Sequence, residues 1–204
     1  LSSAQGLLDL LFLAEHQISP DYLILPKANI QAHCQLVADI LGSDLAVFAI
    51  VEKASTLHEL SHLATPPNNL KGVIFGAADY AQDVSKNPLN MDVARVMDRI
   101  AFHASRLTIQ ALDSPCFAIY DQEQLQLECE RAYDMGFSGK ICIHPAQVPM
   151  VNRLFSFSQS EIQQAQHLIN AKGKGGIVNQ KGQMLGPPFY KYAQGVLDKT
   201  TENS

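Results

Sequence analysis

Two acidic residues follow short apolar stretches of the chain, and their types and positions point most clearly to chemistry. Glu52 comes directly after residues 45–51, and Asp79 lies just beyond residues 72–75. Two carboxylates that face one space repel each other unless a proton or a cation lies between them. Mg²⁺ prefers oxygen ligands, keeps several waters and is readily shared with a substrate. The pair therefore predicts a Mg²⁺ site, and the alternative is a solvated acid beside a helix-capping acid.

The elements that must position these residues are short apolar strands alternating with amphipathic helices. We expect strands at 22–26, 45–51, 72–75, 109–112 and 140–144, and helices at 30–41, 56–63, 92–107, 122–135 (capped by Asp121), 146–154, 160–171 and 189–197. This alternation is typical of a parallel sheet with covered faces. It fits an open doubly wound sheet or the later part of an eight-stranded barrel, and in both folds ligands bind at the carboxyl ends of the strands.

Further candidate residues are Lys27, His144 and Pro145 at the same predicted rim, and Lys140 at a strand edge. Lys27 follows the first strand and Lys140 begins the fifth, where a lysine either pairs with an anionic substrate group or is simply solvated. His144 and Pro145 end the fifth strand. The histidine would hold a phosphate or an acyl group, or it would pack against the rim. Residues 172–188, rich in glycine and lysine, predict a loop or short hairpin.

Residues 58–62 spell H-E-x-x-H, a motif that on a helix places His58 and His62 one turn apart to bind zinc. The longer zinc-protease motif requires glycine and histidine where Thr65 and Asn68 stand, and no further glutamate occurs before Glu123. We therefore favour an exposed polar helix face over a zinc protease.

The composition is that of a globular chain and excludes several classes of protein. The 204 residues include 47% hydrophobic and 17% charged residues, and the net charge of −5 argues against broad nucleic-acid binding. No apolar run approaches the roughly 18–20 residues of a membrane span, and the first 13 residues lack a basic leader, so we expect no signal peptide. The cysteines form no C-x-x-C pair, which favours reduced thiols and a cytoplasmic location.

Four motifs at the predicted strand ends resemble the citrate lyase β-subunit-like (CitE-like) branch of the HpcH/HpaI aldolase superfamily. They are I-L-P-K at 24–27, I-V-E-K-A at 50–54, V-I-F-G-A-A-D-Y at 73–80 and G-F-S-G-K-I-C-I-H-P-A-Q at 136–147. The likeness runs from about residue 20 to the end of the chain. It implies an α/β fold, a TIM (β/α)8 barrel of which this chain supplies about the last five βα units. Residues 1–171 would form this barrel portion, and residues 172–204 a loop and helix that pack on a neighbouring subunit.

The resemblance also implies an activity. Members of this branch are Mg²⁺-dependent carbon–carbon lyases that cleave 3-hydroxyacyl-CoA thioesters of the citramalyl-, malyl- or citryl-CoA type to acetyl-CoA and a 2-oxo acid. By this likeness Glu52 and Asp79 are the metal ligands, and Lys27, Lys140, His144 and Pro145 contact the substrate or its CoA part. A homo-oligomer, trimer or hexamer, is expected, with neither nucleic acid nor membrane as a partner. An acyl-CoA thioesterase and a non-catalytic CoA-binding barrel remnant are the alternatives.

Two departures from the family pattern affect this interpretation. The first strands of the family, with their substrate-binding arginine, have no counterpart here, and because Leu1 is not a methionine we expect a longer chain. The family's general acid/base aspartate is replaced by Gly186. A glycine cannot transfer a proton, and loss of a positioned acid or base typically costs about 10²–10⁴-fold in rate.

Overall fold

The computed structural model describes residues 1, 3–171, 178–180 and 183–202, which fall into two compact units, Leu1–Val151 and Asn152–Ser204. The units divide before residue 171, where the sequence analysis placed the boundary. The helix at 159–171 packs with the last helix of the chain, within the second unit. Each unit is described separately below.

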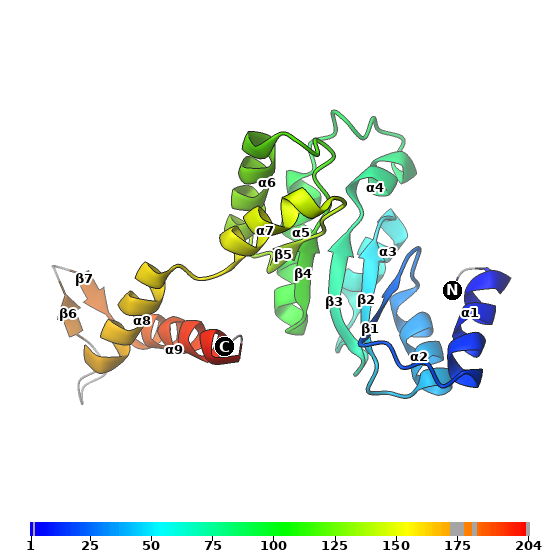
Figure 1. Ribbon diagram of the computed structural model, residues 1–204, viewed down its shortest axis with the longest axis horizontal. Helices are drawn as coiled ribbons and strands as arrows, with labels where there is room; N and C mark the ends of the chain where they lie inside the picture. Colours follow the sequence, from blue (N-terminus) through cyan, green and yellow to red (C-terminus); the bar gives the residue numbers. More distant parts are fainter. Residues whose placement is uncertain (2, 172–177, 181–182, 203–204) are drawn as a thin grey trace. The chain divides into compact units, whose positions relative to one another are not determined.

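The first unit contains a five-stranded parallel sheet in the order β1-β2-β3-β4-β5. Its strands are β1 (Tyr22–Leu25), β2 (Ala46–Val51), β3 (Leu70–Phe75), β4 (Gln110–Asp113) and β5 (Gly139–Lys140). Its helices are α1 (Ala4–Glu15), α2 (Ile30–Leu41), α3 (Ala54–His62), α4 (Ala77–Asp83), α5 (Ala94–Leu107), α6 (Gln122–Asp134), the 3-10 turn η1 (Pro145–Gln147) and α7 (Val148–Phe155), whose last turn belongs to the second unit. The predicted alternation of strands and helices is confirmed (Figure 1).

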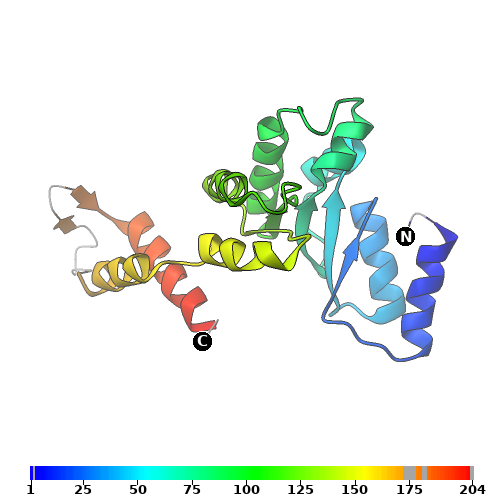
Figure 2. The same cartoon turned by 45° about the horizontal axis from the view of Figure 1, so that its top comes forward.

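In strand β2, buried and half-buried side chains alternate, so one face of this strand is fully buried. In β2, Val47, Ala49 and Val51 are completely buried, whereas Phe48 and Ile50 on the opposite face are half-buried. Helix α3 contacts β2, α5 contacts β3 and β4, and α6 contacts β5, so these helices supply the partners of the buried face (Figure 2). Because the strands are parallel, all their carboxyl ends lie at one edge of this sheet.

The helices begin at side chains that accept hydrogen bonds from otherwise unpaired amides. Asn29 accepts from the amide of Ala32 at the start of α2, and Asp121 accepts from Gln124 at the start of α6, as predicted. Two differences from the expected elements bear on the site. Helix α4 was not expected, and β5 pairs over only two residues instead of five.

The second unit is a helical pair with a hairpin. Helix α8 (Gln159–Ala171) packs on α9 (Pro187–Glu202) around the buried Ala165, Ala193 and Val196. Strands β6 (Val178–Gln180) and β7 (Gln183–Leu185) pair antiparallel, so the hairpin alternative predicted for this segment is confirmed for its described residues. No helix among the described residues is long and apolar enough to cross a membrane.

Candidate metal centre at the strand ends

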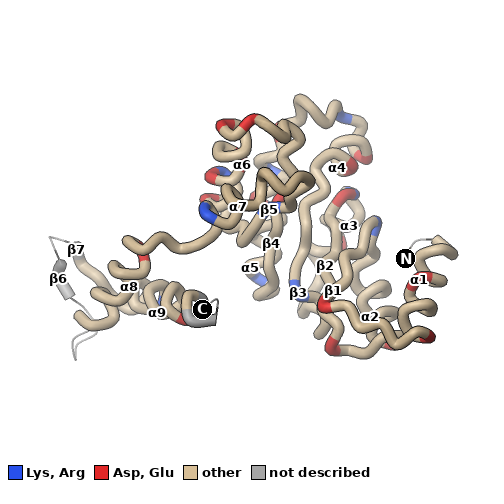
Figure 3. Tube along the Cα trace, viewed as in Figure 1, with Lys and Arg blue, Asp and Glu red and all other residues tan. Residues whose placement is uncertain are grey.

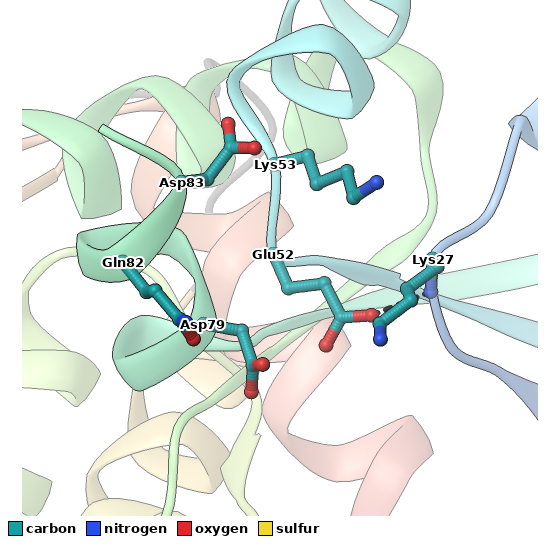
Figure 4. A pocket seen from close by; sticks show the side chains of 6 residues that line it. All are labelled: Lys27, Glu52, Lys53, Asp79, Gln82 and Asp83. Carbon is teal, nitrogen blue, oxygen red and sulfur yellow. Dashed lines mark hydrogen bonds between the residues drawn. The ribbon is translucent and has the colours of Figure 1, made fainter. Parts of the chain in front are cut away.

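Glu52 and Asp79 lie at the carboxyl ends of two neighbouring strands. Val51 at the end of β2 is opposite Phe75 at the end of β3, and Glu52 comes next in the chain. Asp79 lies in the first turn of α4, the short helix that follows β3. The structure brings both residues to one cavity of about 270 Å³, also lined by Lys27, Lys53, Gln82 and Asp83 (Figure 4).

The Glu52 side chain is buried and held in a fixed position. It is 6% exposed, and its Oε1 accepts a hydrogen bond of 2.5 Å from the backbone amide of Lys27. Lys27 adopts a left-handed backbone conformation, with φ of 50°, which is uncommon for a residue other than glycine. The Lys27 side chain points toward the Glu52 carboxylate (Figure 4).

Gly76 creates the space in which Glu52 lies. A Cβ atom at residue 76 would be 2.7 Å from the Cβ of Glu52 and 2.9 Å from Cγ2 of Ile50, closer than real side chains approach. Any side chain at residue 76 would therefore displace the glutamate. The sequence analysis did not single out this glycine, although its place directly after a strand could have indicated a close approach.

The donor set fits Mg²⁺. Asp79 is exposed, and among the residues that the structure describes its carboxylate has no hydrogen-bond or ion-pair partner. The Glu52 and Asp79 carboxylates extend toward the same side of the cavity (Figure 4). Within the described ranges no group of three His, Cys, Asp or Glu side chains forms a metal site. Two carboxylates with open positions for water or substrate oxygens are what Mg²⁺ accepts and what zinc or calcium sites rarely use.

The two carboxylates also line an apolar cavity. It has a volume of about 220 Å³, and Glu52 and Asp79 line it together with Ile24, Ile50, Ile74 and Phe117. The two acids thus line both a polar space and an apolar one. This arrangement suits a ligand with a charged, metal-binding end and a less polar remainder.

Lys140 is paired with buried acids, whereas the sequence analysis expected it to contact the substrate or its CoA part. Its ammonium lies 2.7 Å from Oδ2 of Asp113 and 2.8 Å from Oε2 of Glu128, and the side chain is 1% exposed. Burial acts to lower the pKa of Lys140, but the Asp113 and Glu128 carboxylates outweigh burial and raise it. The Lys140 ammonium therefore forms a buried ion triad with Asp113 and Glu128 and is not available to bind a ligand.

His144 and Pro145 lie in the loop that follows β5. Nδ1 of His144 accepts from the amide of Ala146 and so caps the 3-10 turn that Pro145 begins, and its ring meets the exposed Tyr120 edge-on at 5.6 Å. Neither residue lines the Glu52–Asp79 cavity. The sequence analysis missed Gln147, which is fully buried and joins this loop to the previous one by donating to the carbonyl of Cys116.

The H-E-x-x-H motif serves helix packing. Both oxygens of Glu59 accept backbone amides at the start of α2, from Ile30 at 2.8 Å and Gln31 at 2.9 Å. His58 and His62 are exposed on α3, with their ring centroids 4.1 Å apart. Since the glutamate is occupied and no third ligand completes a metal group within the described residues, the polar-face interpretation is supported.

The basic residues of the chain are spread along both units. In Figure 3 the Lys and Arg positions of the coloured trace are separated from one another and do not gather on one face of either unit. Broad contact with a nucleic-acid backbone needs such a face.

Known proteins similar to this chain share both its sequence and its fold. A (3S)-malyl-CoA thioesterase of Cereibacter sphaeroides is 34% identical over 155 residues, which cover 74% of this chain and 53% of that protein. The mitochondrial citramalyl-CoA lyase of Rattus norvegicus is 27% identical over 228 residues, covering 98% and 67%. The CitE protein of Mycobacterium tuberculosis, solved with magnesium, acetoacetate and coenzyme A, has a TM-score of 0.77 and 28% identity, covering 96% of this chain and 73% of that one.

These comparisons confirm the predicted fold class, five βα units of a TIM-type barrel, and the chain spans about half the length of the first of these relatives. Residues 25–145 match the profile of the HpcH/HpaI aldolase/citrate lyase family, and this range contains all five strands except the start of β1. The protein therefore belongs to the HpcH/HpaI aldolase/citrate lyase family, in its citrate lyase β-subunit-like branch.

Proposed function

We propose that this chain carries the metal centre of a Mg²⁺-dependent carbon–carbon lyase that cleaves a 3-hydroxyacyl-CoA thioester of the malyl-, citramalyl- or citryl-CoA type. The observation that carries the proposal is the opening of the Glu52 and Asp79 carboxylates into one cavity at the ends of paired strands. The similarity to a citramalyl-CoA lyase supports the reaction class.

Glu52 and Asp79 would hold the metal, which when bound would polarise the hydroxyl and carboxylate oxygens of the substrate. The Lys27 amide keeps Oε1 of Glu52 in place, which limits the freedom that the carboxylate would lose on binding. The apolar cavity beside the two acids would receive the part of the thioester that carries no charge. His144 and Pro145, in the loop after β5, remain candidates for contact with the CoA part.

In the proposed reaction the substrate hydroxyl loses its proton, the bond between C2 and C3 breaks, and its electron pair forms the enolate of acetyl-CoA. The oxidised carbon leaves as the carbonyl of a 2-oxo acid, and the enolate takes up one proton. Gly186 lies directly before α9 in the second unit, where its carbonyl accepts the amide of Phe189, and it has no side chain that transfers a proton. The proton donor must therefore be water or another residue.

Thioester hydrolysis is the second candidate, favoured by the 34% identity to a malyl-CoA thioesterase. In that reaction water attacks the thioester carbonyl, and the products are CoA and the intact hydroxy acid. The same two carboxylates would serve either reaction, so the products decide between them.

The experiment that tests the proposal is incubation of the protein with malyl-, citramalyl- and citryl-CoA, with Mg²⁺ or with a chelator, followed by quantification of products. A lyase gives equal amounts of acetyl-CoA and 2-oxo acid, only with Mg²⁺, and Glu52→Gln lowers the rate at least about 10²-fold. Free CoA without 2-oxo acid indicates the thioesterase. Binding of CoA with no product from any thioester indicates a non-catalytic barrel remnant and contradicts both.

We also infer a homo-oligomer, trimer or hexamer, in which residues 172–204 pack on a neighbouring subunit. The exposed Phe189 and Tyr192 on α9 support this contact surface. Light scattering of the purified protein tests it, and a monomeric mass contradicts it. We infer a cytoplasmic location from the cysteines, all four of which are free in the structure. Cell fractionation tests that inference.

A further inference from the structure

The two carboxylates of the proposed metal centre are carried by elements of different rigidity. Glu52 follows β2, is buried and accepts the Lys27 amide, whereas Asp79 is exposed on α4, a helix of seven residues. So short a helix is not stable by itself in water and depends on tertiary contacts. The position of Asp79 relative to Glu52 is therefore set by the contacts that hold α4.

One side of α4 packs against the end of β3. Tyr80 and Ala81 are buried, and the Tyr80 ring meets the ring of Phe75 edge-on, with the centroids 6.0 Å apart. Just before the helix, the Gly76 amide donates to the carbonyl of Val51 and extends the pairing of β3 with β2 by one residue. These contacts hold the start and the middle of α4.

Asp83, the last residue of α4, joins this helix to α3. Its Oδ2 accepts a hydrogen bond of 2.9 Å from the backbone amide of Ala54, the first residue of α3, although the two are 29 positions apart in the chain. The Asp83 side chain extends toward the segment that carries Lys53 (Figure 4). Asp83 lies one helical turn after Asp79, and Ala54 lies two residues after Glu52. One hydrogen bond thus links the helix that carries one ligand with the segment that carries the other.

The charge of Asp83 favours α3 and not its own helix. An acid in the last turn of a helix meets the negative end of the helix dipole, whereas an acid beside the first amides of a helix is stabilising. Lys53, the N-cap of α3, provides no side-chain cap, so the Asp83 carboxylate caps this helix from outside. The first turn of α3 is itself anchored, because the buried Thr56 hydroxyl donates to the carbonyl of Ala28 at 2.9 Å. Asp83 therefore attaches α4 to a fixed point of the fold.

We infer that Asp83 is a positioning residue, which sets the place of Asp79 relative to Glu52 and thereby the affinity of the centre for Mg²⁺. This inference rests on the proposed function, because that function supplies the metal. Asp83 lines the same cavity as the two ligands, but its carboxylate is bonded to the Ala54 amide, so it acts on the metal through α4. Loss of this bond leaves the last turn of α4 unattached, and Asp79 loses part of its fixed position.

The test is a Mg²⁺ titration of the wild type, Asp83→Ala, Asp83→Asn and the matched control Asp121→Ala. Asp121 accepts the Gln124 amide at 2.9 Å at the start of α6, so its truncation removes the same kind of bond at a helix that carries no ligand of the centre. We expect Asp83→Ala to bind Mg²⁺ about fivefold to tenfold more weakly, at the lower end of what the outer partners of metal ligands contribute. Asp83→Asn keeps an oxygen that accepts the Ala54 amide and should restore most of the affinity. Asp121→Ala should bind Mg²⁺ like the wild type.

A variant on the other side of the bond tests the same link. Ala54→Pro removes the donor N–H at the first helical position, where proline is tolerated, and Lys53 before it already has the extended backbone that a following proline requires. This variant should also weaken Mg²⁺ binding. The double variant with Asp83→Ala should bind no more weakly than Ala54→Pro alone, because both changes remove one bond. Losses that add in the double variant overturn the inference.

Two further measurements separate failure of this inference from failure of the proposed function. In the metal-free protein, the amides of α4 should exchange hydrogen faster in Asp83→Ala than in Asp83→Asn, and equal exchange overturns the inference. Glu52→Gln, which removes a ligand, should weaken Mg²⁺ binding with α4 in place. If it does so while Asp83→Ala binds like the wild type, the positioning role alone is rejected. Equal losses in Asp83→Ala and Asp83→Asn reject it too, because Asp83 then acts through its charge. Mg²⁺ binding that Glu52→Gln does not weaken rejects the metal centre and the inference with it.

Discussion

The backbone amide of Lys27 donates to Oε1 of Glu52 across 2.5 Å, although 25 residues separate the two in the chain. The bond joins the ends of β1 and β2 at the rim of the sheet, and Lys27 makes it from a left-handed conformation that most residues avoid. One carboxylate of the proposed metal centre is thus fixed by the backbone, while the other, Asp79, is carried by a short helix.

Gly76→Ala should damage the metal centre more than the fold. The new methyl group would overlap the Glu52 side chain, so the glutamate must leave its present position. We expect Mg²⁺ affinity to fall at least about tenfold, with a loss in the free energy of unfolding of about 1–3 kcal/mol from overpacking. Isothermal titration and urea denaturation measure the two effects. The control is Gly195→Ala in α9, where a Cβ meets nothing within 4 Å, and unchanged Mg²⁺ affinity in Gly76→Ala would contradict the prediction.

The Lys140→Met variant should have a lower free energy of unfolding than the wild type, whereas its ligand binding should be unchanged. It leaves Asp113, whose side chain is 1% exposed, without its cation, and breaking such a pair typically costs about 3–5 kcal/mol. Urea denaturation at pH 7 measures the loss, with the exposed Lys71→Met as the control. A stable Lys140→Met variant that binds CoA thioesters poorly would restore the role of Lys140 as a phosphate contact.

The Glu128–Lys140 pair should make stability depend on acid pH. Burial acts to raise the pKa of Glu128, but hydrogen bonds from Lys140 and Gln124 outweigh it and hold this pKa below the ordinary value of 4.5. Because the folded-state pKa is depressed, the stabilisation is complete above the unfolded-state pKa and is lost as pH falls through the folded-state value. Glu128→Gln should therefore lose less stability between pH 6 and pH 3 than the wild type. Glu130→Gln, an exposed acid on the same helix, should behave like the wild type.

Glu59→Gln should weaken the start of α2 and have no effect on metal content. An amide has one acceptor oxygen and no charge, so one of the two backbone bonds and the favourable charge at the helix N-terminus are lost. A loss of about 1 kcal/mol in the free energy of unfolding is expected. Glu15→Gln, at the exposed end of α1, is the control. Stoichiometric zinc that disappears in His58→Ala would instead support the zinc site.

Much of the sheet was predictable because its apolar strands are short and separated by clear helical periodicity. Helix α2 begins and ends where its pattern of apolar residues predicts. Helix α4 was not predicted, because its seven residues are too few to show the repeat of apolar residues that marks a helix. Strand β5 is short because only Gly139 and Lys140 pair with β4 before the chain turns toward η1.

The site was predictable where it depends on position along a strand, and not where it depends on a partner from another element. Glu52 and Asp79 follow neighbouring strands, so their meeting in one cavity follows from parallel pairing. Whether a lysine is exposed or buried depends on acids that lie far away in sequence. Lys140 meets Glu128 of α6, whereas Lys53 meets none among the residues described, and no local pattern distinguishes the two.

The most direct test of the Glu52–Asp79 centre is a Mg²⁺ titration of the wild type, Glu52→Gln, Asp79→Asn and the control Asp98→Asn, an exposed acid on α5. One Mg²⁺ per chain should bind to the wild type and to Asp98→Asn with equal affinity. Each of the other two variants should bind at least about tenfold more weakly, because each loses one of two charged ligands. Equal Mg²⁺ affinity in all four proteins would contradict the account.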